Sequence, residues 1–116
     1  MYDAEEFHDL ALCRVRALND EIRRHFTDGR IVFSRGIATL PVADQAEILD
    51  RVRTFEEFTA DNDPYTEHDF GAFEYGSQRI CWKIDYYDAE MEFGSEDPAD
   101  PSNTTRVLTI MLAEEY

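Results

Sequence analysis

The residues best able to do chemistry in this chain are one histidine and the carboxylates near it. His68 is followed directly by Asp69, and Asp85 lies in a segment predicted to pair with the residues around His68. An imidazole that is oriented by a carboxylate can act as a general base. One hypothesis is therefore a small acid/base or metal-assisted enzyme centred on His68, Asp69 and Asp85.

Known site patterns are nevertheless missing around His68. No Ser or Cys lies in an activating motif, no two histidines have metal-binding spacing, and Pro64 stands where a calcium loop needs its mid-loop glycine. We expect no cofactor and no bound metal, and the simplest role for His68 is as a structural partner of Asp85. A cation, if present, would find oxygen ligands among Asp61, Asp63, Glu67, Asp69, Asp85 and Asp88.

Charge supports a second hypothesis. The chain has 26 Asp and Glu against 11 Lys and Arg, a formal net charge of −15. Residues 1–40 have a net charge of only −1, whereas residues 41–116 have −14. This field repels nucleic acids and membrane surfaces and attracts basic proteins. An adaptation to salt would distribute the acidic residues evenly, which this chain does not do.

The acidic residues concentrate between Glu56 and Asp100, where fourteen carboxylates stand against Arg79 and Lys83. We predict a non-enzymatic interaction protein whose acidic face docks a basic protein, in its strongest form a nucleic-acid mimic that inhibits a DNA- or RNA-binding protein. The alternative is a solvated face that keeps a small protein soluble. The predicted binding residues are Asp61, Asp63, Glu67, Asp69, Asp85, Tyr87, Asp88, Glu90, Glu92, Glu96, Asp97 and Asp100.

A predicted β-hairpin positions these residues. In residues 78–87 apolar and mostly polar side chains alternate, which is typical of a half-buried strand. Gly76-Ser77 joins this strand to residues 70–75 and suits a type II′ turn. That turn places Gly71 opposite Trp82 and His68 opposite Asp85. Trp82 belongs in the core, because a base-stacking platform would need basic surroundings.

Two helices and three further strands complete the prediction. An apolar stripe predicts a helix over residues 3–26, with Asp3 as N-cap and with Arg14, Arg16, Arg23 and Arg24 on a solvated mixed-charge face. A second helix begins at Pro41 and runs to about Phe58. The remaining strands are predicted over residues 30–34, 91–93 and 104–112.

The predicted fold is α+β, with two helices packed on one face of an antiparallel sheet of four to five strands, in the order α-β-α-β-β-β-β. Residues 1–116 form a single domain, in which residues 1–29 are the N-terminal helix and turn. The chain has no apolar run of membrane-spanning length and no basic-then-apolar leader. We expect a cytoplasmic protein with Cys13 and Cys81 reduced.

Five sequence blocks resemble an uncharacterised bacterial family of short acidic proteins. The resemblance covers residues 30–116, supplies no activity or ligand, and implies a bacterial, cytoplasmic setting. The blocks are Asp61-Asn-Asp-Pro-Tyr65, Glu67-His-Asp-Phe-Gly71, Trp82-Lys-Ile-Asp-Tyr-Tyr-Asp88, Asp97-Pro-Ala-Asp-Pro101 and Thr105-Arg-Val-Leu-Thr-Ile-Met-Leu112.

Overall fold

The protein is built on a four-stranded sheet with the strand order β1-β4-β3-β2. The structure is a computed structural model that describes residues 4–116, so the predicted N-cap Asp3 lies outside the described residues. The strands are β1 (Arg30–Phe33), β2 (Phe70–Tyr75), β3 (Gln78–Tyr87) and β4 (Thr105–Leu112). The helices are α1 (Ala4–His25), α2 (Arg35–Ala38), α3 (Val42–Arg53) and the 3₁₀ turn η1 (Ala113–Glu115).

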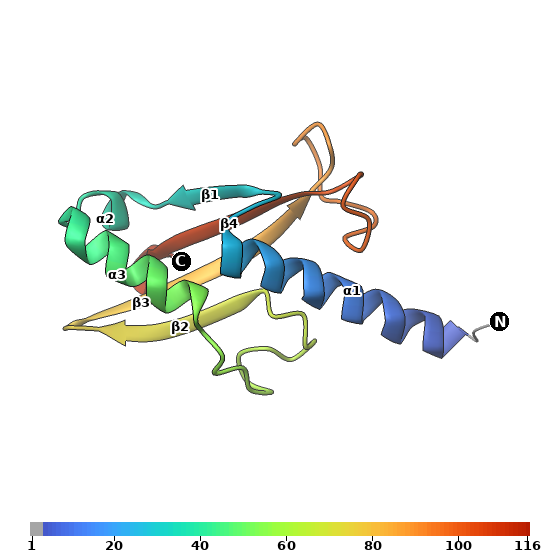
Figure 1. Cartoon of the computed structure of the whole chain (residues 1–116), viewed down its shortest axis with the longest axis horizontal. Coiled ribbons are helices and arrows are strands. Elements are labelled where there is room, and N and C mark those ends of the chain that lie inside the picture. Colours follow the sequence, from blue (N-terminus) through green and yellow to red (C-terminus); the bar gives the residue numbers. More distant parts are fainter. Residues whose placement is uncertain (1–3) are drawn as a thin grey trace.

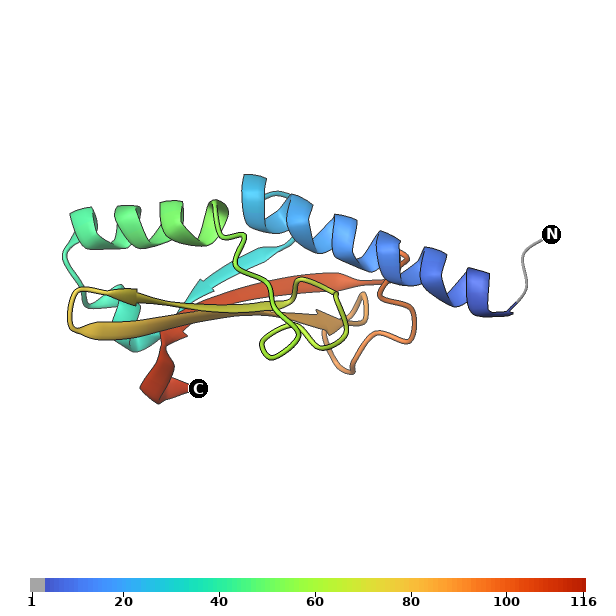
Figure 2. The same ribbon diagram turned by 90° about the horizontal axis from the view of Figure 1, so that it is seen from below.

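The two long helices, α1 and α3, cover the same face of the sheet, while η1 projects from the opposite face (Figure 2). The N-terminal part of α1 runs past the end of the sheet, which gives the molecule its elongated shape (Figure 1). Its principal extents are 52 × 32 × 23 Å. The predicted α+β architecture with two helices on one face is therefore confirmed.

The central hairpin follows the predicted register. Gly76 has a φ of 60°, which a glycine-first turn requires, and Tyr75 pairs with Gln78. Gly71 pairs with Trp82, and a Cβ atom built on Gly71 would lie 2.5 Å from Trp82 Nε1. Only glycine therefore leaves room for the indole. Trp82 is completely buried within the core, as predicted.

The sheet is mixed, so the prediction of an antiparallel sheet is wrong for one strand pair. β3 pairs with β2 and β4 in antiparallel fashion, but β1 runs parallel to β4. A parallel pair needs a long connection, and here α2, α3 and the β2–β3 hairpin all lie between β1 and β4. Sequence periodicity gives no direction for such a distant pairing.

Helical structure between β1 and β2 also differs from the prediction. α2 was not predicted; Ser34 caps it by accepting a hydrogen bond from the amide of Ile37. α3 starts one residue later than predicted, because Pro41 is its N-cap, and it ends at Arg53. The chain then turns inward, so that Phe55 and Phe58 pack edge-on against Trp82.

The predicted strand over residues 91–93 is wrong. Met91 has a φ of 62°, and the amide of Asp88 donates to the carbonyl of Phe93 at 2.7 Å. The Asp88 carboxylate also accepts from the amide of Glu92. These bonds close a tight loop, and a single bridge between Tyr87 and Gly94 is the only strand-like pairing it makes within the described chain.

Candidate interaction surface

His68 is held between α1 and its own loop rather than by Asp85. Its Nδ1 lies 2.9 Å from Asp20 Oδ1, and its Nε2 lies 3.7 Å from Asp63 Oδ2. Its ring stacks on Phe58 with centroids 3.8 Å apart and an interplanar angle of 6°. Both edges and one face of the imidazole are therefore occupied, which is typical of a structural side chain.

The predicted contact between His68 and Asp85 is wrong because the hairpin ladder stops short of His68. The last ladder bond runs from the amide of Ile84 to the carbonyl of Asp69. His68 itself has a φ of 57°, a left-handed conformation that turns its side chain toward the helices. Asp85 lies on the opposite face of β3, where it pairs with Lys83. His68, Asp69 and Asp85 therefore do not form one site.

A buried polar network continues from His68 beneath α1. Asn19, which is fully buried, donates to the hydroxyl of Tyr86 at 2.7 Å and to the carbonyl of Glu67 at 3.1 Å. Its amide oxygen accepts from Arg106 Nε at 2.8 Å. Arg106 is buried as well, and burial lowers the pKa of its guanidinium. The network fastens the loop of residues 59–69 to α1 and to β4.

Arg23 is completely buried, so the prediction that it lies on a solvated face is wrong. One Nη donates to the carbonyls of Val52, Arg53 and Phe55, at 2.8 to 3.1 Å, and the other pairs with Asp20. The last carbonyls of α3 have no partner within the helix. The Arg23 guanidinium supplies a donor for these carbonyls and thereby joins the C-terminal ends of α1 and α3.

Two carboxyl groups of this region sit close to Tyr86. Burial, followed by the charge of Asp69, raises the pKa of Glu67, and burial also raises the pKa of Asp69. The Tyr86 hydroxyl donates to Glu67 at 3.2 Å. Glu67 and Asp69 are therefore half-buried among other protein groups. They add less to the exposed negative charge than a count of carboxylates in the sequence suggests.

The other predicted binding residues divide into two groups. Asp63 is buried and accepts from the amide of His68, while Asp88 and Asp100 accept hydrogen bonds within their own loop. These three stabilise loop conformation. The exposed carboxylates are Asp61, Glu90, Glu92, Glu96 and Asp97.

The two acidic loops, residues 59–69 and 88–104, lie at the same end of the sheet and flank α1 (Figure 1). Arg14 Nε donates to the carbonyl of Ala99 at 3.2 Å, and Arg16 Nη1 donates to the carbonyl of Thr66 at 3.2 Å. One helix thus holds both loops through their main-chain carbonyls, and these two contacts use none of the loop carboxylates.

Each acidic loop also presents an exposed aromatic ring. Tyr65 is 75% exposed and Phe93 is 70% exposed. Large rings of this kind are enriched among residues that dominate protein–protein binding energy. Tyr87, which is the aromatic residue among the predicted binding residues, is only half-exposed and lies on the sheet face opposite the helices. Aromatic and acidic side chains therefore occur together at this end of the molecule.

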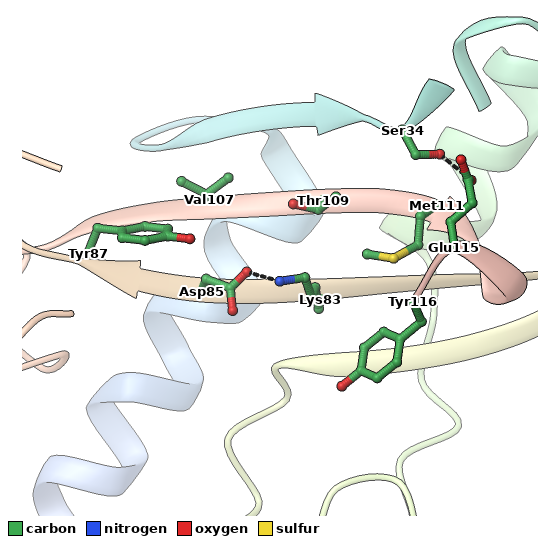
Figure 3. Close-up of a pocket in the computed structure, with 9 residues that line it drawn as sticks. All are labelled: Ser34, Lys83, Asp85, Tyr87, Val107, Thr109, Met111, Glu115 and Tyr116. Carbon is green, nitrogen blue, oxygen red and sulfur yellow. Dashed lines mark hydrogen bonds and ion pairs between the residues drawn. The ribbon is translucent and has the colours of Figure 1, made fainter. Parts of the chain in front are cut away.

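The helix-free sheet face holds a hollow of about 550 Å³ (Figure 3). Figure 3 shows the Lys83–Asp85 pair at its centre, with Tyr87 toward one end and Tyr116 toward the other. The bond to Asp85 raises the pKa of Lys83. Glu115, at its rim, accepts from Ser34, Gly36 and Leu112, and these bonds lower its pKa. The charges in this hollow are satisfied internally.

Neither a metal site nor a membrane span is defined by the described residues. Among the side chains that the structure describes, no three His, Cys, Asp or Glu are grouped so that they could hold a metal ion. None of the helices there combines the length and apolar character needed to cross a bilayer. Cys13 and Cys81 are both free, as predicted, and burial raises the pKa of Cys81.

The fold and this surface define a small α+β protein with an acidic, aromatic-bearing end. Residues 33–115 match the model of a family described as a protein of unknown function, DUF3768, and the chain belongs to that family. No curated protein and no solved structure matches the chain. α1 lies outside the matched residues, although it supplies Asn19, Asp20 and Arg23 to the buried network.

Proposed function

We propose that this protein is a non-enzymatic interaction protein whose acidic end docks a basic protein. The observation that carries the proposal is the convergence of two acidic loops, each with an exposed aromatic ring, at one end of the sheet. Carboxylates attract and orient a cationic partner, while Tyr65 and Phe93 offer apolar contact area.

Competition with nucleic acid is the stronger form of this proposal. Duplex DNA carries a charge about every 1.7 Å of helix axis, so a partner that binds DNA or RNA already has a groove suited to closely spaced anions. An acidic loop pair held rigidly by α1 would occupy that groove as a decoy. We place this activity in the cytoplasm, consistent with two free thiols.

Immobilised protein incubated with bacterial lysate tests the proposal. We expect it to retain basic proteins at low salt, to lose them at high salt, and to lose them when duplex DNA is added. A bait with the exposed loop carboxylates neutralised, Glu90→Gln/Glu92→Gln/Glu96→Gln, should retain several-fold less.

The matched control bait is Asp9→Asn/Asp28→Asn/Glu114→Gln, which removes equal charge outside the acidic loops. It should bind as well as the natural chain. If both triple variants lost the same amount of retained protein, net charge alone, and not the position of the carboxylates, would explain the binding. Retention of no basic protein by the natural chain would contradict the proposal.

An acid/base enzyme at His68 is the second candidate. The hydrogen bond from His68 Nδ1 to Asp20 gives the imidazole an orienting carboxylate, and a hollow of about 370 Å³ adjoins the ring. Asp63 faces the other ring nitrogen, however, which leaves no free edge for a substrate. The interaction role is therefore better supported.

A further inference from the structure

β2 is an edge strand, since the sheet continues only on its β3 side. The sequence of β2, Phe-Gly-Ala-Phe-Glu-Tyr, contains no Pro and no Lys, the residues that commonly protect a sheet edge from pairing with another chain. The other edge, β1, has only four residues. β2 is therefore the strand with room for an additional partner.

The register shows which main-chain groups of β2 face outward. Asp69 and Ile84 form a hydrogen-bonded pair, and in an antiparallel ladder such pairs alternate with non-bonded ones. The amides and carbonyls of Phe70, Ala72 and Glu74 consequently point away from β3. The loop after α3 crosses β2 near its start, and no other backbone segment passes beside the half nearer the β2–β3 turn (Figure 2). We call that half the open edge.

Negative charge surrounds the open part of this edge. The Tyr75 hydroxyl donates to Asp44 at 2.7 Å and to Glu47 at 3.0 Å, which places two α3 carboxylates beside the end of β2. A hollow of about 180 Å³ lies against Phe73. Its lining residues are Arg51, Thr54, Phe55, Glu56, Glu57 and Phe73.

The charges near this edge indicate which kind of strand could pair with it. Five carboxylates border the edge and its hollow, against two guanidinium groups. The acids are Asp44, Glu47, Glu56, Glu57 and Glu74, and the bases are Arg51 and Arg79. A second copy of this chain, with its own charge of −15, would be repelled. A cationic strand would be attracted.

We infer that the open edge of β2 binds an extended basic segment of the partner as an added strand. The inference rests on the proposed function and specifies how that partner is held. Main-chain hydrogen bonds to Ala72 and Glu74 would supply affinity. Lys or Arg at alternate positions of the segment would face the carboxylates of α3 and the hollow beside Phe73.

Amide hydrogen exchange with a defined probe tests this inference. The probe is an acetylated peptide in which Lys and Thr alternate, and its control is the same peptide methylated on every main-chain nitrogen, which blocks both edges of the strand. We expect the unmethylated peptide to slow exchange at least tenfold at Ala72 and Glu74, whereas Phe73 and Tyr75 change little. The methylated peptide, which has equal charge, should give no such protection.

Ala72→Pro provides the matching variant. It removes an amide that points outward, so the ladder to β3 keeps its bonds, and we expect peptide affinity to fall at least tenfold. Should this variant fail to fold, Glu56→Gln/Glu57→Gln provides a second one, which should weaken binding about threefold.

Each outcome separates the inference from the proposed function. Binding of both peptides without protection at Ala72 and Glu74 would overturn the added strand, while docking at the acidic end could still stand. Self-association at this edge would overturn the choice of occupant. The added strand would also be overturned if basic proteins bound only through the acidic loops and Ala72→Pro had no effect on their affinity. Failure of every basic protein or peptide to bind would overturn both.

Discussion

His68 and Asp20 are joined by a 2.9 Å hydrogen bond across 48 residues of sequence. The bond connects α1 to the acidic loop of residues 59–69, in which Thr66 and His68 both have left-handed φ values. Such conformations are unfavourable for residues with side chains and persist only where surrounding contacts hold them. α1 is therefore a structural clamp for the loop.

Replacement of the clamping histidine should loosen this loop. We expect His68→Ala to lower the free energy of unfolding by about 1–3 kcal/mol, because it removes a partly buried hydrogen bond and the stacking on Phe58. Urea denaturation measures the loss. His25→Ala changes an exposed histidine at the C-terminal end of α1 and should have an effect below about 0.5 kcal/mol. Equal effects from both variants would contradict the clamp.

Arg23 should be the most sensitive charged residue of α1. Arg23→Met keeps much of the side-chain volume but removes the guanidinium bonds to three carbonyls at and just after the end of α3 and to Asp20. We expect a loss of about 3–5 kcal/mol in the free energy of unfolding.

Arg24→Met is the matched control for that measurement. Arg24 adjoins Arg23 but is exposed, so its replacement should cost less than about 0.5 kcal/mol. Thermal or urea melts of both variants measure this difference in the free energy of unfolding. If Arg23→Met were as stable as Arg24→Met, the buried bonds to α3 would contribute nothing measurable.

Gly71 should tolerate no side chain. A Cβ atom there would approach Trp82 Nε1 to 2.5 Å and Phe55 Cε1 to 2.7 Å, so we expect Gly71→Ala to cost about 1–3 kcal/mol through overpacking. The single tryptophan reports the change by fluorescence. Gly94→Ala is the control, because its added methyl group would have only Tyr86 O nearby, at 3.8 Å. An unperturbed Gly71→Ala protein would show that the core can shift.

The raised pKa values of Glu67 and Asp69 predict a pH dependence of stability. A carboxyl group whose pKa is raised by folding binds protons more tightly in the folded state, so stability increases as the pH falls from neutral toward the ordinary glutamate value. We expect Glu67→Gln to be slightly more stable than the natural chain at pH 7, because solvent screens this partly exposed group, and to flatten this dependence. Urea melts between neutral and mildly acidic pH measure it. A profile identical to the natural chain would contradict the assignment.

Sequence reasoning located the elements better than the polar contacts between them. Alternation in β3 and the Gly76-Ser77 turn determine the hairpin register locally, which is why the pairing of Gly71 with Trp82 was predictable. The parallel pairing of β1 with β4 depends on residues far apart in sequence, and no local pattern encodes it.

Among the site residues, too, local features could be predicted from the sequence, whereas contacts between distant elements could not. Arg23 lies off the apolar stripe of α1, so periodicity places it in solvent; only the position of α3 reveals that it caps that helix. Asn19 and Arg106 were missed because they bond to each other and to the loop of residues 59–69 and β3, which are far away in sequence. His68 was identified as structural, but its partner was not, because the hairpin register cannot show where the chain leaves the strand.

The salt dependence of partner binding tests the central claim most directly. For a captured and purified basic partner, the dissociation constant would be measured at several salt concentrations with the natural chain and with both triple variants. We predict that Glu90→Gln/Glu92→Gln/Glu96→Gln weakens binding and flattens its salt dependence, while Asp9→Asn/Asp28→Asn/Glu114→Gln leaves both nearly unchanged. Binding that is indifferent to salt, or equally affected by the two variants, would contradict docking through the acidic loops.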